Sequence, residues 1–269
     1  MPTRIKHLAI VSGNYAIEGK FYEALFGMKA FSGQRSDSAV AVTDGYVGMN
    51  VNPRAPGRQA GFDHFGFEVE SVDEVQRRVS EAYPNVTLLT RPSNRPFAGI
   101  SMHDPAGNVF DLSKVGMANR KDVYVDVAGA GAQQPRHISH FMLRVVDPAG
   151  VARFYRDVFD LQELDKDAGD PNTYLTDGVV TLVIAPWRIA DYTGSGIERP
   201  ALDHVGFKVE SLQAFQADLE ALTDRNPYLA PLPLRKGEEG QARHKLLKGC
   251  RYGSIQLADP DGVLIDVSE

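Results

Sequence analysis

Two short stretches of the sequence repeat an unusual combination of residues: DHFGFEVES at residues 63–71 and DHVGFKVES at residues 203–211. Each places a histidine inside an apolar, strand-like segment, where an aliphatic side chain would pack better. A second histidine and an aspartate accompany each one, and the resulting triplets are His7, His64, Asp111 and His140, His204, Asp266. Two imidazoles and one carboxylate form a facial triad, which suits Fe(II), Mn(II), Ni(II) or Zn(II) and leaves coordination positions open.

The alternation of side chains along a strand places the members of each triplet on one face of their sheet. In the segment 63–69 the apolar residues share one face, so that His64 lies on the opposite face. His7 and Asp111 sort in the same way in their own segments, and the second triplet repeats the pattern. If the polar face of the sheet curls into a hollow, each triplet converges there.

A structural explanation competes with the metal site. A single histidine in a strand is usually a hydrogen-bonded structural residue, and an aspartate near a strand end usually caps a turn. The same residue types at corresponding strand positions in both triplets favour the metal. Duplication alone would preserve the histidines by descent, however, so the two triplets are not independent evidence.

Three segments recur in the same order along the chain, which indicates an internal duplication. The matched pairs are 5–28 with 138–161, 63–79 with 203–219, and 104–113 with 259–268. Between the copies lies DVAGAGAQQP, a stretch with little to bury that is typical of a linker. The sequence therefore predicts a first domain over residues 1–116, a linker over 117–134 and a second domain over 135–269.

Each copy is itself divided into two units of the same order: a strand, a helix and three further strands. Ser71 is the expected N-cap of the second helix, with Glu74 as its capping-box partner. The segments DPAG and DPDG predict tight hairpin turns, since proline presets φ and glycine accepts a positive one. The predicted fold class is α+β: four β-α-β-β-β modules paired into two domains, each a curled mixed sheet with helices outside.

The composition excludes several classes of protein. Apolar residues make up 43% and charged residues 24% of the chain, which is typical of a globular protein with a sizeable core. The net charge of −6 disfavours a nucleic-acid binder. Because no apolar run could span a bilayer and the start lacks a signal-peptide core, we expect a cytoplasmic protein. Cys250 is the only cysteine, so no disulfide forms within the chain, and we assign that cysteine no role.

The β-α-β-β-β units, the histidine of the opening strand, the DHxGF strand and the DPxG ending together resemble the vicinal oxygen chelate superfamily. Its members include glyoxalase I, bleomycin- and fosfomycin-resistance proteins, methylmalonyl-CoA epimerase and the extradiol ring-cleaving dioxygenases. The resemblance covers both copies, apart from the linker and the segment 229–250, and it implies two glyoxalase/dioxygenase-like domains. These motifs do not specify a reaction, because one fold hosts many chemistries.

The resemblance implies a metal ligand at every member of both triplets. The superfamily usually has Glu as the last ligand, and the shorter Asp111 and Asp266 imply a metal that sits deeper or binds more weakly. Glyoxalase-type enzymes add a fourth protein ligand on strands that here read GYVGMNVN and GVVTLVIAP, without a carboxylate. A site with three ligands fits oxygen activation or bidentate substrate chelation better than glyoxalase chemistry.

Two such domains in a chain of this length resemble the two-domain extradiol dioxygenases, in which the C-terminal domain holds the iron. This resemblance makes His140, His204 and Asp266 the first-choice site, and the other triplet a second site or a relic. Extradiol enzymes carry a substrate-orienting tyrosine where this chain has Gln256, with Tyr252 nearby but displaced. This resemblance makes Gln256 and Tyr252 candidate catalytic residues.

His244 lies in the region of the acid–base histidine of the extradiol enzymes, and it is our candidate proton shuttle. A further histidine that the extradiol pattern places before the fifth strand is missing from WRIADYTGSGIERPALD, which puts catechol cleavage as such in question.

The segment 234–253 is longer and more charged than its counterpart in the first copy. It could form a lid in which Arg243 and Arg251 reach an anionic substrate. The alternative is a solvated surface loop, which we expect for most of its charges. Trp187 could line the mouth of the second hollow or pack in the core.

Three classes of function follow. The leading hypothesis is a metal-dependent non-haem oxygenase acting on a small oxygenated or aromatic molecule, with Fe(II) as the expected metal and Mn, Ni or Zn as alternatives. The second is a glyoxalase- or epimerase-like lyase or isomerase, and the third is a metal-free, drug-binding resistance protein. The expected partner is a small molecule, with no nucleic acid and no membrane, and a homo-oligomer stays open.

Overall fold

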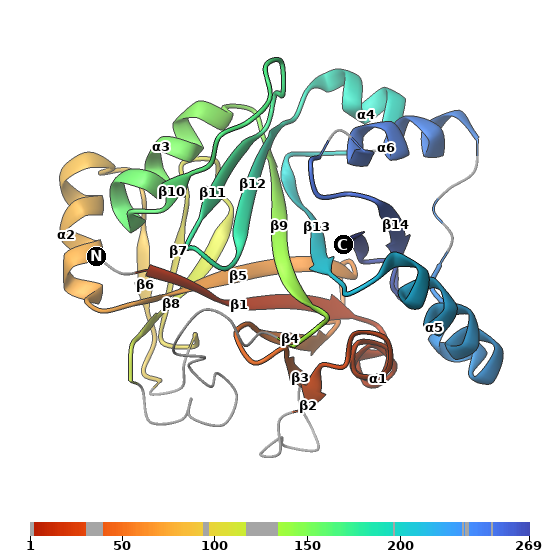
Figure 1. Cartoon of the computed structure of the whole chain (residues 1–269). Coiled ribbons are helices and arrows are strands. Elements are labelled where there is room, and N and C mark those ends of the chain that lie inside the picture. Colours follow the sequence, from red (N-terminus) through yellow and green to blue (C-terminus); the bar gives the residue numbers. More distant parts are fainter. Residues whose placement is uncertain are drawn as a thin grey trace.

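The computed structural model describes residues 3–30, 40–93, 97–116, 134–195, 197–232, 234, 237–248 and 250–269. Figure 1 shows the arrangement of the elements along the chain. Except for its last residue, the predicted linker 117–134 lies outside the described residues, so that the domain boundaries stay a prediction. Among the described residues, no helix is both long and apolar enough to cross a membrane.

The first half forms one mixed sheet with the strand order β2-β3-β4-β1-β5-β8-β7-β6. The strand–helix–three-strand unit occurs twice in it, as predicted. The elements are β1 (Thr3–Ser12), α1 (Tyr15–Phe26), β2 (Lys29–Ala30), β3 (Val40–Thr43), β4 (Gly48–Pro53), β5 (Gly61–Val69), α2 (Val72–Ala82), β6 (Leu88–Thr90), β7 (Ile100–His103) and β8 (Val109–Lys114).

The second half forms a sheet with the order β10-β11-β12-β9-β13-β15-β14. The elements are β9 (His137–Val145), α3 (Pro148–Phe159), β10 (Gln162–Glu163), β11 (Thr173–Thr176), β12 (Thr181–Pro186), α4 (Ile189–Ser195), β13 (Ala201–Lys208), α5 (Leu212–Arg225), the 3-10 helix η2 (Pro227–Leu229), α6 (Glu238–Lys248), β14 (Ile255–Ala258) and β15 (Leu264–Ser268). The counterpart of β6 is reduced to a single bridge between Leu232 and Ala258, and helix α6 is inserted after it. The α+β class and the two duplicated, mixed and open sheets are confirmed.

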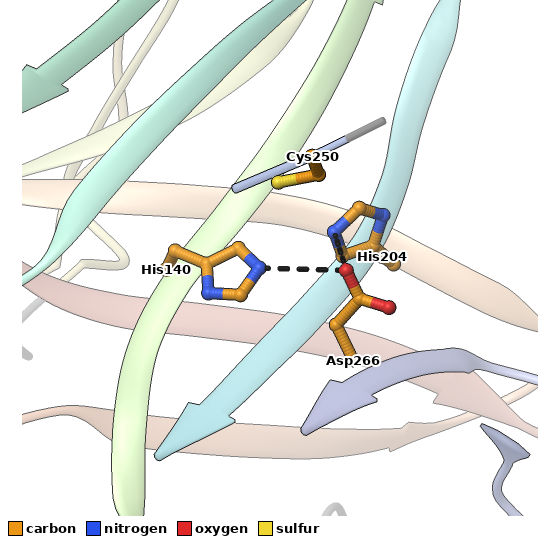
Figure 2. Close-up of side chains that lie close together, drawn as sticks. All are labelled: His140, His204, Cys250 and Asp266. Atoms are coloured by element: carbon orange, nitrogen blue, oxygen red, sulfur yellow. Dashed lines mark ion pairs between the residues drawn. The ribbon is translucent and has the colours of Figure 1, made fainter. Parts of the chain in front are cut away.

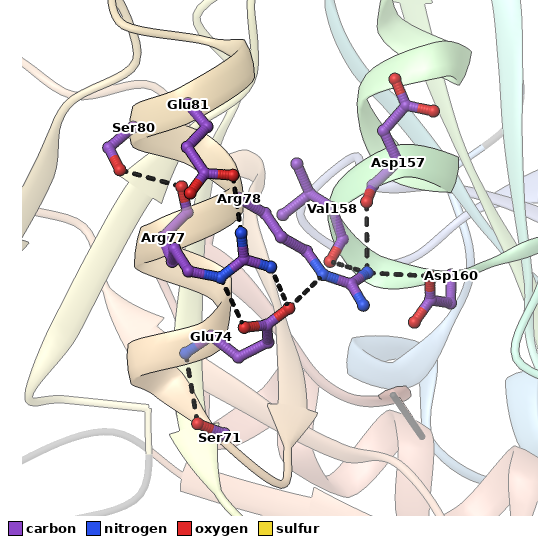
Figure 3. Close-up of polar contacts among 9 residues, drawn as sticks. All are labelled: Ser71, Glu74, Arg77, Arg78, Ser80, Glu81, Asp157, Val158 and Asp160. Atoms are coloured by element: carbon purple, nitrogen blue, oxygen red, sulfur yellow. Dashed lines mark hydrogen bonds and ion pairs between the residues drawn. The ribbon is translucent and has the colours of Figure 1, made fainter.

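Local sequence signals explain the ends of several elements. The Ser71 hydroxyl accepts a hydrogen bond from the Glu74 backbone N–H at 3.2 Å, which caps α2 as predicted. The second bond of the expected capping box does not form, because the Glu74 carboxylate accepts hydrogen bonds from Arg77 and Arg78 instead (Figure 3). In the DPAG turn, Gly107 has a φ of 88°, which explains the need for glycine there.

The two sheets share one hydrophobic core that includes residues of both halves. In Figure 1, β1 and β5 run across β9 and β13. Helix α1 of the first half places Phe26 against Phe207 of the second sheet, with ring centroids 3.8 Å apart. Helix α3 places Phe159 against Phe67 of the first sheet, at 4.4 Å. Each half therefore lends a helix that covers the apolar face of the other sheet.

Two buried tyrosines also connect the halves, each through a hydrogen bond to an aspartate of the other half. The Tyr22 hydroxyl donates to Asp259 Oδ2 at 2.8 Å, and the Tyr155 hydroxyl donates to Asp104 Oδ2 at 3.0 Å. All four side chains are fully buried. Because each aspartate opens the turn before the last strand of its own half, each half anchors that turn in the other.

Two further aspartates connect the halves through the backbone. Asp44 Oδ2 accepts a hydrogen bond from the Ile138 N–H at 2.8 Å, and Asp177 Oδ2 accepts one from the Ile5 N–H at 2.6 Å. Each carboxylate follows the third strand of its module and satisfies a backbone donor near the start of the opening strand in the other half. Like the two tyrosine bonds, these two bonds are reciprocal: each half provides one aspartate and one partner residue.

Helices α2 and α3 meet at a charged contact, shown in Figure 3. Arg78 of α2 donates to the carbonyl oxygens of Asp157 and Val158, at 3.2 and 3.3 Å, and to Asp160 Oδ1 at 2.8 Å. These carbonyls belong to the C-terminal turn of α3, where the helix dipole favours a cation. Arg78 thus stabilises the end of a helix in the other half.

We expect Tyr155→Phe to lower the free energy of unfolding by about 1–3 kcal/mol, because it leaves the buried Asp104 without one of its donors. The matched control is Tyr83→Phe, which removes an exposed bond of 2.8 Å to Asp157 and should change stability by less than about 0.5 kcal/mol. Urea unfolding measures both variants. Equal effects would contradict a special contribution from the buried tyrosine.

Candidate metal centres

The register of three neighbouring strands brings the first donor group together. β1 and β5 pair His7 with Gly66, and β5 and β8 pair Gly66 with Asp111, so that the three residues form one row across the sheet. His64 stands two residues before Gly66 and points to the same face. A Cβ at Gly66 would lie 3.1 Å from the Cβ of His7 and 2.8 Å from the Phe97 ring. The glycine of the DHxGF motif therefore leaves room for the ligands on either side.

The second half repeats this row with less space. β9 and β13 pair His140 with Gly206, and β13 and β15 pair Gly206 with Asp266. A Cβ at Gly206 would overlap the His140 ring. Here the imidazole lies over the glycine backbone, and any side chain at that position would displace it.

The donor atoms of the first centre have the spacing of ligands that share one ion. His7 Nε2 and His64 Nε2 are 3.2 Å apart, and His64 Nε2 is 3.3 Å from Asp111 Oδ2. Donors about 2.1 Å from a common metal, at angles between octahedral and tetrahedral, lie about 3.0–3.4 Å from each other. These three residues therefore fit a divalent metal, and the shorter aspartate reaches far enough to contribute.

Outer side chains orient the ligands of the first centre. His64 Nδ1 donates to Asp63 Oδ2 at 2.8 Å, which leaves the lone pair of Nε2 directed at the centre. Ser101 donates to Asp111 Oδ1, and Arg91 donates to the Ser101 hydroxyl at 2.7 Å. The Phe97 ring stacks on His7, with centroids 4.7 Å apart. The three ligands are thus held in place before any metal binds.

The second centre gathers four donors, which Figure 2 shows from the side. They are His140, His204, Asp266 and Cys250, and their ligand atoms all lie within 4.8 Å of one another. His204 Nε2 is 3.2 Å and His140 Nε2 is 3.8 Å from Asp266 Oδ2. The three residues of the predicted triplet are fully buried and Cys250 is 3% exposed, so this centre is closed to solvent.

A buried ion-pair network supports His204. His204 Nδ1 donates to Asp203 Oδ2 at 2.7 Å, and Asp203 Oδ1 accepts from Arg144 at 2.9 Å and from Arg243 at 2.5 Å. The side chains of Asp203 and Arg144 are only 3% and 4% exposed. The carboxylate–histidine pair repeats the arrangement of the first half, with two arginines added behind it.

The second centre has unpaired polar atoms that a bound ion would satisfy. Nε2 of His140, Nε2 of His204 and both carboxylate oxygens of Asp266 are buried and make no hydrogen bond to any described residue. His204 Nε2 and Asp266 Oδ2 are close enough for a bond but are not aligned for one. Because buried polar groups are normally paired, these atoms fit the binding of a cation.

The electrostatics of the first centre favour positive charge. Burial alone would lower the pKa of His64, but its hydrogen bonds to Asp111 and Asp63 outweigh burial and raise that pKa to about 9. A protonated imidazole thus supplies the charge that a metal ion would otherwise bring. Metal binding must displace this proton, which couples metal affinity to pH.

The electrostatics of the second centre also favour positive charge. Burial opposes the charged form of His204, yet the charge of Asp266 and the bond to Asp203 raise the pKa of His204 well above its ordinary value. Burial would raise the pKa of the Cys250 thiol, but the neighbouring imidazoles of His140 and His204 lower it to about 7. A thiolate is therefore accessible near neutral pH beside two imidazoles.

The predicted catalytic residues lie at different distances from this centre. The Tyr252 ring stacks on His140, with centroids 4.6 Å apart, and its hydroxyl is 3.3 Å from Thr181 Oγ1. Gln256 pairs with Asp266 across β14 and β15, and its buried Nε2 has no hydrogen-bond partner among the described residues. His244 is half-buried on α6 and does not belong to the donor group.

The residues predicted to bind substrate are engaged with the protein itself. Arg243 supports Asp203, as described above. Arg251 donates to the Asp165 carbonyl oxygen at 2.8 Å and lies over the Tyr252 ring. Trp187 donates its indole N–H to the Ile197 carbonyl oxygen at 2.9 Å. Their contact with a substrate stays a prediction.

The segment 234–253 is not a plain loop, although its described charged residues Glu238, Lys245 and Arg251 are exposed. Residues 238–248 form helix α6, which packs against α4 in Figure 1. Leu247 and Cys250 are buried, and Arg243 reaches Asp203 in the sheet. The segment covers the polar face of the second sheet because it has apolar and charged partners there that the sequence alone does not reveal.

Two cavities adjoin these centres. One of about 400 Å³ lies between α4 and α6, and its lining includes Arg144, Arg188 and Lys245. A second, of about 990 Å³, is lined by residues of both halves, including Asp63 and Asp203. The orienting aspartates of both centres thus border one shared space.

Some residues of the centres have no place in the sequence-based prediction. The two orienting aspartates precede their histidines in the DH dipeptide of each copy, and this repeated dipeptide was an available signal. Cys250 had no such signal, because its position depends on how α6 packs. Its sulfur lies within the second donor group, a position that the sequence did not indicate.

A family model described as the Glyoxalase/Bleomycin resistance protein/Dioxygenase superfamily matches residues 4–112 and 137–267. Both donor groups lie within these two segments, and the predicted linker lies between them. No curated protein matches the chain in sequence.

The chain is also similar to solved structures. For the Mn(II)-bound glyoxalase from Novosphingobium aromaticivorans, the TM-score is 0.65 at 17% identity, covering 98% of this chain and 81% of that chain. For a catechol 2,3-dioxygenase the TM-score is 0.62 at 15% identity, covering 98% of this chain and 86% of that chain. For homoprotocatechuate 2,3-dioxygenase from Brevibacterium fuscum, in complex with 3,4-dihydroxyphenylacetate, the TM-score is 0.63 at 14% identity. The match covers 98% of this chain and 79% of that chain. At these identities the likeness concerns the fold.

We expect purified protein reconstituted with a divalent metal to bind two equivalents, one in each half. His64→Ala and His204→Ala should each lose one equivalent, and the double variant both, because each substitution removes a donor that no neighbour replaces. Elemental analysis after dialysis measures the content. The control is His137→Ala, whose ring bonds the Gln134 carbonyl oxygen and should leave the content unchanged. Binding of two equivalents of metal by the double variant would contradict the assignment of a metal site to each half.

Proposed function

The chain belongs to the glyoxalase/bleomycin resistance protein/dioxygenase superfamily, and on this premise we propose that it is a metal-dependent non-haem oxygenase. Its substrate would be a small molecule with two adjacent oxygen atoms. The structural neighbours are enzymes that include two ring-cleaving dioxygenases and a glyoxalase, which supports an enzyme of this superfamily.

One observation carries this proposal: three oriented donors converge in the first half, and one of them, His64, stays partly exposed. His7, His64 and Asp111 have the spacing of a facial triad, and the side chains of His64 and Asp111 are 19% and 8% exposed. The resemblance to extradiol enzymes favoured the second half instead. We prefer the first half because an oxygenase needs open coordination positions that a substrate can reach.

Different residues around this centre have different roles. A divalent ion bound there would supply Lewis acidity and a meeting point for two substrate oxygens and dioxygen. Asp63 holds His64 in the tautomer that presents Nε2 to the centre. Ser101 occupies Asp111 Oδ1 and so leaves Oδ2 for the ion.

The solved structures support one substrate class for the first test. The neighbours include enzymes described as acting on catechol or found with 3,4-dihydroxyphenylacetate, which share two adjacent hydroxyl groups on a ring. A three-donor centre can bind both oxygens of such a molecule at once. This supports a vicinal diol of an aromatic ring as the first class to test.

A second candidate function is a lyase or isomerase that uses its metal without dioxygen. The second centre favours it, because a fourth donor, Cys250, leaves fewer positions for substrate and none is exposed to solvent. Tyr252 and Gln256 are the polar side chains beside that centre, and they are the candidate catalytic groups there. A metal-free binding protein is the third possibility.

We expect protein loaded with Fe(II) to consume dioxygen in the presence of catechol or 3,4-dihydroxyphenylacetate. His64→Ala should abolish this uptake, whereas Asp63→Asn, which only disturbs the orientation of His64, should reduce it by about 10–100-fold. An oxygen electrode measures the rates, and the appearance of ring-cleaved product is followed by absorbance.

His204→Ala serves as the matched control, since it removes the equivalent ligand of the other centre and should retain the uptake. Loss of uptake in His204→Ala but not in His64→Ala would transfer the chemistry to the second half. Conversion of a hemithioacetal without dioxygen would support the lyase, and absence of bound metal in every preparation would support the binding protein.

A further inference from the structure

We propose that Cys250 is the fourth protein ligand of the metal centre in the second half, so that this centre has a donor set of two imidazoles, one carboxylate and one thiolate. This inference goes beyond the proposed oxygenase function, because it concerns the other centre and does not depend on which reaction the chain performs.

The position of the sulfur is the first observation. Sγ of Cys250 belongs to a group whose ligand atoms all lie within 4.8 Å of one another, together with His140, His204 and Asp266. Figure 2 shows the cysteine side chain beside both imidazoles, on a segment that follows α6. Four side chains of three ligand types, from three strands and one loop, thus surround one point.

The unpaired atoms around this point are an independent observation. Nε2 of both histidines and both oxygens of Asp266 are fully buried and make no hydrogen bond within the described residues. Leaving four such atoms without a partner is costly in a protein interior. A cation at the centre of the group satisfies the two nitrogens and the carboxylate, and the thiolate completes the shell.

The segment that carries the cysteine is packed closely against the centre. The Cys250 N–H donates to the Leu247 carbonyl oxygen at 2.9 Å, which ties it to the end of α6. A Cβ at Gly253 would lie 2.8 Å from Gln256 Nε2 and 2.9 Å from Asp266 Oδ2. The backbone at Gly253 thus passes close to the carboxylate ligand, and Cys250 lies on the same segment.

The charge of the buried cluster also calls for a thiolate. Arg144 and Arg243 balance Asp203 and Asp266 in number, and a divalent ion adds two positive charges to this sealed site. A thiolate at Cys250 offsets one of them, which lowers the penalty of burying net charge. On binding, the Sγ–H bond breaks, its proton passes to solvent, and the sulfur donates its electron pair to the metal.

The donor sets of the two centres therefore differ in kind. The first centre offers two nitrogens and one oxygen, which suits Fe(II) or Mn(II) in an open geometry. The second adds a soft sulfur and has four protein ligands, which suits tetrahedral Zn(II) or its substitute Co(II). One chain would then hold two metals of different preference.

The experiment uses the full chain with His64→Ala, so that only the second centre loads. Metal-free, reduced protein is titrated with Co(II) and followed by absorption. We expect an intense sulfur-to-cobalt charge-transfer band in the near ultraviolet at one equivalent. Since Cys250 is the only cysteine, such a band reports on this residue alone. Cys250→Ser in the same background should lose the band and bind Co(II) at least about 10–100-fold more weakly.

A second measurement needs no change at the cysteine. X-ray absorption of the His64→Ala protein loaded with Zn(II) should show a sulfur neighbour at about 2.3 Å. Bound Zn(II) with only nitrogen and oxygen neighbours, or bound Co(II) without the charge-transfer band, would overturn the proposal. His204→Ala in the same background is the control and should bind neither metal.

Discussion

Both metal centres depend on a row of three paired residues in which a glycine separates a histidine from an aspartate. Gly66 and Gly206 occupy the middle strand of each row, so that side chains from the two outer strands can meet above the backbone. A Cβ at Gly66 would crowd the Phe97 ring and the Cβ of His7, and a Cβ at Gly206 would overlap the His140 ring. Because glycine has no side chain, it leaves space on this face of the sheet, and the curvature of the strands enlarges that space.

The same row gives two unlike centres because different segments cover it. In the first half His64 stays partly exposed, and the outer partners of the ligands are Asp63, Ser101 and Arg91. In the second half α6 brings Arg243 and Cys250 over the sheet, and solvent is excluded. The insertion of helix α6 after the counterpart of β6 thus changes the polarity, the charge and the number of donors at an otherwise duplicated site.

The sequence predicts what is local and repeated. The alternation in residues 63–69 was sufficient to place His64 opposite the apolar face, because a period of two is a property of the strand itself. The second bond of the capping box at Ser71 failed because Glu74 finds stronger, charged partners in Arg77 and Arg78. Cys250 could not be predicted, since its place depends on the packing of α6, which has no counterpart in the first copy.

The two halves cannot be treated as separate carriers of their centres. Asp104 opens the turn that leads into β8, which carries Asp111, and its buried partner is Tyr155 of the other half. By the same relation Tyr22 of the first half holds the turn that leads into β15 and Asp266. Each carboxylate ligand is therefore positioned by a hydrogen bond from across the shared core. Selection for one active centre would preserve the anchoring residues of both halves, which gives a physical reason for the duplicated architecture to persist even where the two centres differ.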